Sequence, residues 1–215
     1  MRIMTQEDML HQQDIPHLAE EIIKKNVTLI ALHDVVQSRH QAPATEELLE
    51  GRFHKDAEFE IRMDNSAALL AYFLRKKGKS CSWVWIPHTG KKKSEVSGTA
   101  FLVVDRSIRC IDRFLIPDHA SHTVLGIQMD DREDWFYCLS MEPWDHTGKN
   151  FLSQWKILNC CIASKRLCGT VWLLGDFGIS DSDNMESCAC MLAGGWKYEE
   201  YGTNKNYSIW CSLKM

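Results

Sequence analysis

The 215-residue chain is long enough for one domain or at most two small ones, and 45% of its residues are hydrophobic and 25% charged, as in a packed globular domain. Its formal net charge of −4 gives no overall positive field that would attract nucleic acid. The N-terminal stretch MRIMTQEDML lacks the apolar segment of a secretory signal. No window approaches the roughly 18 uninterrupted apolar residues of a membrane span. We therefore expect a single domain over residues 1–215, in the cytoplasm and without a membrane span.

Nine cysteines are many for this length, and most stand in apolar stretches. Because no secretory signal precedes them, the pattern predicts reduced thiols in the core of a cytoplasmic protein. The groups Cys160-Cys161 and Cys188-Ala189-Cys190 lack the C-x-x-C spacing of a zinc knuckle. We therefore do not expect a zinc site.

The first third of the chain predicts a strand, a helix and a second strand. Residues 3–5 fit a short strand, and residues 17–25 carry apolar side chains on one face of a helix. Residues 27–36, VTLIALHDVV, are nearly all apolar before the His-Asp pair, which is typical of a strand covered on both faces. Residues 40–63 are polar and poorly patterned, and we expect a long loop with a turn or two of helix.

The middle of the chain predicts one helix followed by strands. Asp64-Asn65-Ser66 supplies an N-cap for a helix over residues 67–77, which Gly78 ends. The acidic segment 130–134 is typical of a solvated turn, and the basic cluster at residues 75–79 of a solvated helix end. Five strands are expected, over residues 82–86, 98–104, 107–114, 123–129 and 135–141.

The last third carries apolar residues at helical spacing between residues 149 and 165. A buried strand over residues 170–174, a helix over residues 184–192 and a final strand over residues 207–213 follow. This order of helices and strands predicts an α/β sandwich in which helices cover the sheets.

The strand at residues 170–174 leads into Gly175-Asp176-Phe177-Gly178. The triplet Asp-Phe-Gly binds metal in protein kinases, but a kinase also needs a Gly-rich loop, a strand lysine and an H-R-D segment upstream. The first two do not stand where a kinase requires them, and H-R-D is absent. The triplet therefore does not indicate a kinase.

Five segments, in order, resemble the endonuclease/exonuclease/phosphatase superfamily, and most closely its bacterial branch related to maltose-6'-phosphate phosphatase. VTLIALHDV resembles the family's "DVIALQEV", FYCLSMEPWD its "FYSCHMGWWD", and WLLGDFG its "LLMGDFN". Between VTLIALHDV and FYCLSMEPWD lie two further segments, DNSAALLAYFLRKKG and SWVWIPHTGKKKSEVSGTAFLV. They are similar to a helix and a pair of strands of the family. The resemblance implies a four-layer α/β sandwich of two mostly antiparallel sheets flanked by helices, the deoxyribonuclease-like fold.

The resemblance also implies hydrolysis of a phosphoester with one or two Mg²⁺ ions, or Mn²⁺, held by hard oxygen ligands. The family's metal-binding positions fall at Glu7 (or its neighbour Asp8), at Asp34 and at Asp176. Asp176 is also expected to take part in catalysis. For Asp34, a solvated carboxylate at a strand end is the alternative interpretation.

Three family features are missing from this sequence. Ser140 stands where the family has a histidine that stabilises the transition state, and Gly178 replaces the asparagine of "GDFN". The family's C-terminal aspartate and histidine have no counterpart, because Tyr207 or Ser208 stands at the aspartate position and the chain is expected to be shortened there. Catalytic groups act as a unit, so we expect an impaired or repurposed protein with a binding role.

An active metal-dependent phosphoesterase with a rearranged site is the alternative, acting on a sugar phosphate or another small phosphoester. His33 or His88 would then take the histidine role, although a structural role for each is an open alternative. A third hypothesis is a cysteine-based enzyme that uses Cys138 or Cys160.

The expected partner is a small phosphorylated ligand or another protein, and we do not expect nucleic acid because no long basic stripe is present. Trp83, Trp85 and Trp144 could line the binding cleft if they are exposed. Core packing is the alternative for tryptophans at strand spacing.

Overall fold

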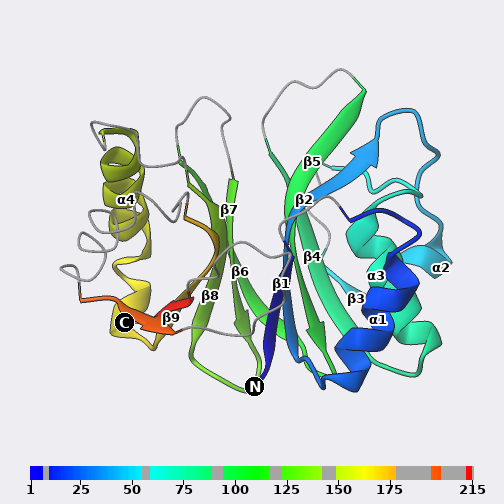
Figure 1. Cartoon of the computed structure of the whole chain (residues 1–215), viewed down its shortest axis with the longest axis horizontal. Coiled ribbons are helices and arrows are strands. Elements are labelled where there is room, and N and C mark those ends of the chain that lie inside the picture. Colours follow the sequence, from blue (N-terminus) through cyan, green and yellow to red (C-terminus); the bar gives the residue numbers. More distant parts are fainter. Residues whose placement is uncertain are drawn as a thin grey trace.

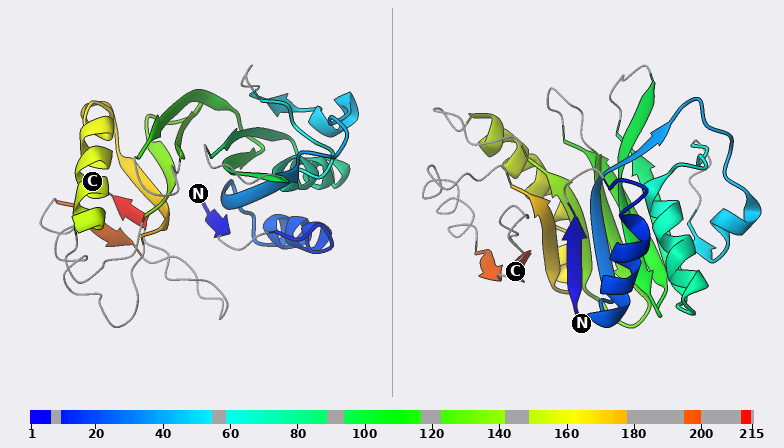
Figure 2. Two further views of the ribbon diagram at one scale, coloured as in Figure 1. Left: turned by 90° about the horizontal axis from the view of Figure 1, so that it is seen from above. Right: turned by 45° about the vertical axis from the view of Figure 1, so that its right-hand side comes forward.

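The computed structural model describes residues 1–6, 10–54, 59–88, 94–116, 123–141, 149–177, 195–199 and 212–214. Two sheets pack face to face, and helices cover their outer sides (Figure 1). Seen from above, α4 and the pair α1 and α3 stand at opposite sides of the sandwich (Figure 2). The predicted α/β sandwich of two sheets between helical layers is therefore confirmed.

The first sheet has five strands in the spatial order β1-β2-β5-β4-β3. β1 runs parallel to β2, and β3 runs parallel to β4, whereas β5 is antiparallel to both of its neighbours. All strands except β5 therefore point the same way. Their bounds are β1 Ile3–Gln6, β2 Leu29–Ser38, β3 Arg52–Phe53, β4 Cys81–Pro87 and β5 Glu95–Val104.

The second sheet has six strands in the order β10-β11-β9-β8-β7-β6. β8 and β9 are parallel, and the other pairs are antiparallel. The bounds are β6 Ile108–Leu115, β7 Thr123–Met129, β8 Trp135–Ser140, β9 Val171–Asp176, β10 Lys197–Glu199 and β11 Ser212–Lys214.

Helices α1 (Ile15–Lys24) and α3 (Ser66–Lys76) cover the first sheet, and α4 (Lys149–Ile162) covers the second (Figure 1). A short helix α2 (Glu46–Leu49) packs on α3, and a turn of 3₁₀ helix, Lys165–Leu167, follows α4. Within the described ranges, no helix is long and apolar enough to cross a membrane. The cytoplasmic location stays a prediction.

Three apolar clusters follow from the alternation of side chains along the strands. One lies between the first sheet and helices α1 and α3, and another lies between the second sheet and α4. The third is shared by the inner faces of the two sheets, and it consists of Leu29, Ala31, Val84, Ile86, Phe101, Val103, Ile108, Leu125, Ile127, Met129, Phe136, Cys138 and Leu174. We call this third cluster the inter-sheet core.

Most sequence-predicted elements are present within a few residues of their expected bounds, and the strand at residues 123–129 has the predicted bounds. The loop expected over residues 40–63 contains α2 and also β3, which was not predicted; β10 was missed as well. The helix predicted over residues 184–192 lies outside the described residues. Of the final strand predicted over residues 207–213, only the end is described, within β11.

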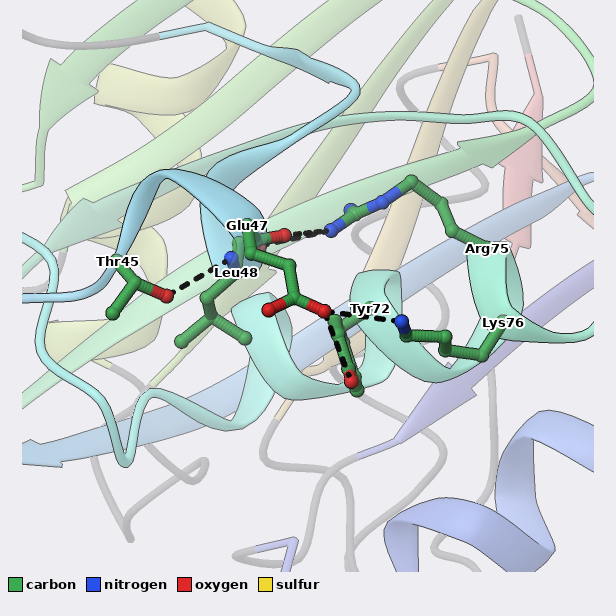
Figure 3. Close-up of polar contacts among 6 residues, drawn as sticks. All are labelled: Thr45, Glu47, Leu48, Tyr72, Arg75 and Lys76. Carbon is green, nitrogen blue, oxygen red and sulfur yellow. Dashed lines mark hydrogen bonds and ion pairs between the residues drawn. The ribbon is translucent and has the colours of Figure 1, made fainter.

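The basic cluster at residues 75–79 is the solvated helix end that was predicted. Arg75 holds α2 against α3, because its Nη2 donates to the carbonyl oxygens of Glu47 at 2.9 Å and Leu48 at 3.1 Å (Figure 3). Lys76 pairs with the Glu47 carboxylate at 3.0 Å. The acidic segment 130–134 is likewise a turn whose carboxylates pair with arginines, such as Asp131 with Arg106 at 3.1 Å.

The prediction that the cysteines are core thiols is wrong for four of the six that the structure describes. Cys81 and Cys138 are buried, whereas Cys110, Cys160, Cys161 and Cys168 are exposed, and all six are free thiols. Cys110 lies on β6, the edge strand of its sheet, and the next two lie on α4 outside its buried residues. An apolar stretch of sequence therefore did not mean burial at these positions.

Asn65 links α3 to the end of β2, and its replacement tests how strongly that link stabilises the fold. Its Oδ1 accepts from the N–H groups of Ala67 and Ala68, both at 3.1 Å, and its Nδ2 donates to Gln37 Oε1 at 3.0 Å. We expect Asn65→Ala to lower the free energy of unfolding by about 2–3 kcal/mol, since a cap and a buried hydrogen bond are lost. Urea denaturation measures the change.

Thr45→Ala is the matched control, because Thr45 caps the four-residue helix α2 through one bond of 3.3 Å to Leu48 N–H. We expect a loss of about 1 kcal/mol or less there. Equal losses for the two variants would contradict the special weight given to Asn65.

Candidate functional site

The ends of several strands meet at one edge of the sandwich. In the first sheet, Ala100 pairs with Leu32 and Trp85, and Gly98 pairs with Val35 and Pro87. Residues 33 and 34 of β2 therefore lie level with residue 99 of β5 and with the C-terminal end of β4. The strands β1 and β2 run upward toward this edge in Figure 2.

In the second sheet, β8 and β9 end at the edge where β7 begins, because β7 is antiparallel to β8. The two sheets are joined here by hydrogen bonds from Thr123, the first residue of β7. Its N–H donates to His88 Nδ1 at 3.2 Å, and its Oγ1 donates to the Pro87 carbonyl at 3.2 Å. The strand ends of both sheets therefore form one surface, which we call the strand-end edge.

A polar layer caps the inter-sheet core at the strand-end edge. Each of its members continues the alternation of apolar residues on an inner face, as His33 follows Leu29 and Ala31, and His88 follows Val84 and Ile86. Four side chains in this layer are at most 8% exposed, namely His33, His88, Thr99 and Thr123. On each inner face, the inward-pointing position next to the last apolar residue therefore carries a hydrogen-bonding side chain.

The two sequence-predicted histidines come together in this layer. The ring centroids of His33 and His88 lie 6.4 Å apart, and the ring planes differ by 23°. The backbone N–H of His88 donates to the Ser97 carbonyl at 2.8 Å, which fixes the end of β4 against β5. The structure thus brings both histidines to one place, and a role for either in chemistry stays a prediction.

Asp34 reaches solvent because β2 contains a bulge. The pairing with β5 shifts between Leu32 and Val35, and both of these residues pack into the core beneath α1 and α3. Two residues three positions apart share one face of a strand only if an extra residue is inserted. Asp34 takes the left-handed conformation, with φ +50°, which aspartate tolerates better than most residues, and its side chain is exposed.

Ser140 and Asp176 lie side by side at the ends of the parallel strands β8 and β9, where their Cα atoms are register partners. Gly175, just before Asp176, has φ +129°, and a Cβ there would overlap the Leu139 carbonyl oxygen. Only glycine fits this approach of the two strands. The structure describes the Asp176 backbone, but its side chain lies outside the described parts of the chain.

The expected metal ligands can be tested only in part. Glu7 and Asp8 lie outside the described residues, as does Gly178, while Gln6 at the end of β1 pairs with Leu32. Within the described ranges, no group of three or more His, Cys, Asp or Glu side chains is placed to hold a metal ion. Asp34 is the one predicted ligand whose side chain is described, so the described residues do not by themselves form a magnesium site.

Two residues of the polar layer were not identified by the sequence analysis. Thr99 stands on the inner face of an otherwise apolar strand, and its Oγ1 is buried without a hydrogen-bond partner among the described residues. Thr123 begins β7 and donates to Pro87, the last residue of β4, and to His88, which follows it. The signal available in the sequence was a threonine at an alternate position of an apolar strand, as in Thr99-Ala100-Phe101.

The tryptophan and cysteine hypotheses are not supported at this edge. Trp83 and Trp85 are at most 1% exposed and pack beneath α1 and α3, so core packing is confirmed for both and they do not line a cleft, while Trp144 lies outside the described residues. Cys138 is buried in the inter-sheet core. Cys160 is exposed on α4, which covers the outer face of the second sheet.

A cavity of about 490 Å³ lies at the opposite end of the sandwich. Its charged groups are largely paired: Lys79 and Ser80 hold the pKa of Asp105 below its usual range, and Arg106 pairs with Asp131. Burial raises the pKa of Cys81 to about 12, so its thiol is protonated at neutral pH. The cavity is lined by Gly51, Arg75, Ser80, Cys81, Asp105, Arg106, Ser107 and Asp130.

Neither a family model nor a curated protein matches the sequence. Solved structures do match. An endonuclease/exonuclease/phosphatase family protein from Leptotrichia buccalis superposes with a TM-score of 0.68 at 18% identity, covering 100% of this chain and 86% of that protein. A mannosyl-6-phosphatase from Bacteroides thetaiotaomicron gives a TM-score of 0.56 at 10% identity, with 99% and 83% covered.

A 3' phosphatase from Neisseria bound to a product DNA hairpin gives a TM-score of 0.55 at 13% identity, with 100% of this chain and 85% of that protein covered. At these identities the matches establish the fold. The chain has the α/β fold of endonuclease/exonuclease/phosphatase family proteins over its full length.

Gly175 is expected to be indispensable for the strand-end edge. Gly175→Ala should lower the free energy of unfolding by several kcal/mol, about 3 or more, since the new methyl group would overlap backbone and the φ is unfavourable. Gly78→Ala is the control, because Gly78 also has positive φ, +81°, yet nothing lies within 4 Å of the new Cβ. That change should cost only about 1 kcal/mol. Thermal denaturation of both variants makes the comparison, and similar losses would contradict the close approach of β8 and β9.

Proposed function

We propose that this chain is a divergent member of the endonuclease/exonuclease/phosphatase superfamily, from the branch related to maltose-6'-phosphate phosphatase. It binds a small phosphorylated ligand at the strand-end edge and hydrolyses it poorly. The observation that carries the proposal is Ser140 beside Asp176 in the register of β8 and β9. This is where the resemblance puts the family's histidine, and a neutral hydroxyl stands there instead.

Binding is supported by the polar layer. Imidazole and hydroxyl groups gather where the inter-sheet core ends, and they suit the oxygen atoms of a phosphoryl group. A preorganised group that stabilises the transition state contributes roughly 10²-fold or more to the rate. With Ser140 at the histidine position, we expect the ligand to bind but to be hydrolysed slowly.

The proposed binding does not require a divalent metal ion. Mg²⁺ or Mn²⁺ at Asp34, with Glu7 and Asp176, would supply positive charge to the phosphoryl oxygens. The described residues contribute the single carboxylate of Asp34, so no step of the proposed binding depends on a metal ion.

An active phosphoesterase is the second candidate function, and the His33–His88 pair favours it. One of these rings would then supply the hydrogen bond or charge that Ser140 does not. The substrate would be a sugar phosphate or another small phosphoester, the former in keeping with the Bacteroides mannosyl-6-phosphatase that has the same fold. A protein partner is the alternative to a small ligand, and we do not propose nucleic acid, since the net charge is −4.

Calorimetric titration with a hexose 6-phosphate, with and without Mn²⁺, tests the proposal. We expect saturable binding and a phosphate release rate well below about 1 s⁻¹, the low end of typical enzyme turnover. Asp34→Ala should remove any Mn²⁺ dependence of binding. Asp105→Ala is the matched control, because Asp105 is also exposed at positive φ, +56°, but at the far end of the sandwich.

The outcomes separate the candidates. Release above about 1 s⁻¹ that Asp176→Ala abolishes would favour the active phosphoesterase. Absence of binding by a folded protein would contradict both functions. Equal effects of Asp34→Ala and Asp105→Ala would remove Asp34 from the site.

A further inference from the structure

Three hydrogen bonds tie the end of β4 to both sheets at His88. The backbone N–H of His88 donates to Ser97 on β5, at 2.8 Å. Its Nδ1 accepts the backbone N–H of Thr123 on β7, at 3.2 Å, and Thr123 Oγ1 donates to the neighbouring Pro87 carbonyl. His88 and Thr123 are 8% and 5% exposed, so water competes little for these bonds.

The bond from Thr123 decides where His88 carries its proton. A backbone N–H can only donate, so Nδ1 must present its lone pair and cannot carry a proton. The neutral imidazole then holds its one proton on Nε2, whereas an imidazolium would set one N–H against another. We infer that Thr123 fixes His88 as a neutral imidazole whose Nε2–H is a hydrogen-bond donor to a phosphoryl oxygen at the strand-end edge.

The donor role of His88 rests on the proposed function, whereas the tautomer rests on the contact with Thr123 alone. His88 in this state contributes a hydrogen bond and no charge. It can neither accept a proton as a general base at Nδ1 nor replace the positive charge that Ser140 lacks. Thr123 is a positioning residue, since it acts on the ligand only through His88. Any added positive charge in the layer must come from another group, and His33 is the ring that faces His88.

Nitrogen-15 NMR of the histidine rings tests the tautomer without any ligand. We expect the His88 signals at neutral pH to show a protonated Nε2 and an unprotonated Nδ1, assigned by loss of these signals in a His88 variant. A protonated Nδ1, whether in the other neutral tautomer or in an imidazolium, would overturn the inference. A residue that merely fills space would not select one tautomer.

Two substitutions separate the hydrogen bond that His88 Nδ1 accepts from Thr123 from the donor role of Nε2–H. Inorganic phosphate is the probe. His88→Asn places an amide oxygen near the position of Nδ1, so it should keep the melting temperature but weaken phosphate binding about 10-fold or more. His88→Gln places an amide N–H near Nε2 but removes the acceptor for Thr123. It should lower the melting temperature more than His88→Asn does, and should weaken phosphate binding less.

Wild-type affinity in His88→Asn would overturn the donor role. A wild-type protein that binds neither phosphate nor a hexose 6-phosphate would contradict the proposed function and the donor role together, while the nitrogen spectrum still decides the tautomer.

Discussion

Face-to-face packing of the two sheets determines where the candidate functional residues of this chain can lie. The inner faces share one apolar core, whose burial is the main favourable contribution to joining the sheets. At the strand-end edge the same faces carry His33, His88, Thr99 and Thr123. A polar side chain buried in the middle of this core would cost free energy, whereas at the edge it can bind a ligand. The candidate site is thus the polar boundary of the core.

Two local backbone features place residues at this boundary. The bulge in β2 lets Leu32 and Val35 pack on one side and turns Asp34 out to solvent. Gly175 lets β9 approach β8 closely, which sets Ser140 and Asp176 in register. Each feature uses a positive φ, at Asp34 itself and at Gly175 beside Asp176, and the resemblance implicates both aspartates in metal binding or catalysis. Backbone irregularity at the boundary is the means by which regular strands present the candidate functional groups.

The sequence was informative where apolar side chains form runs or recur at regular spacing. The apolar runs of β2, β4, β5, β7 and β8 and the cap at Asn65 predicted most elements, and the ordered segments predicted the fold. The strand β3 has two residues and no pattern, and the burial of Trp83 depends on which face α3 covers. Thr123 could not be found from sequence, because its contact with His88 joins residues 35 positions apart across two sheets. Sequence spacing does not encode such contacts.

The central claim is that the strand-end edge binds a phosphoryl group without efficient hydrolysis. Amide chemical shifts recorded as a hexose 6-phosphate is added, together with the phosphorus-31 spectrum of the same sample, test it most directly. The account predicts shifts concentrated at His33, His88, Thr123 and Ser140 while the phosphoester stays intact. Shifts that instead surround Arg75 and Arg106 at the far end, or prompt release of inorganic phosphate, would contradict it.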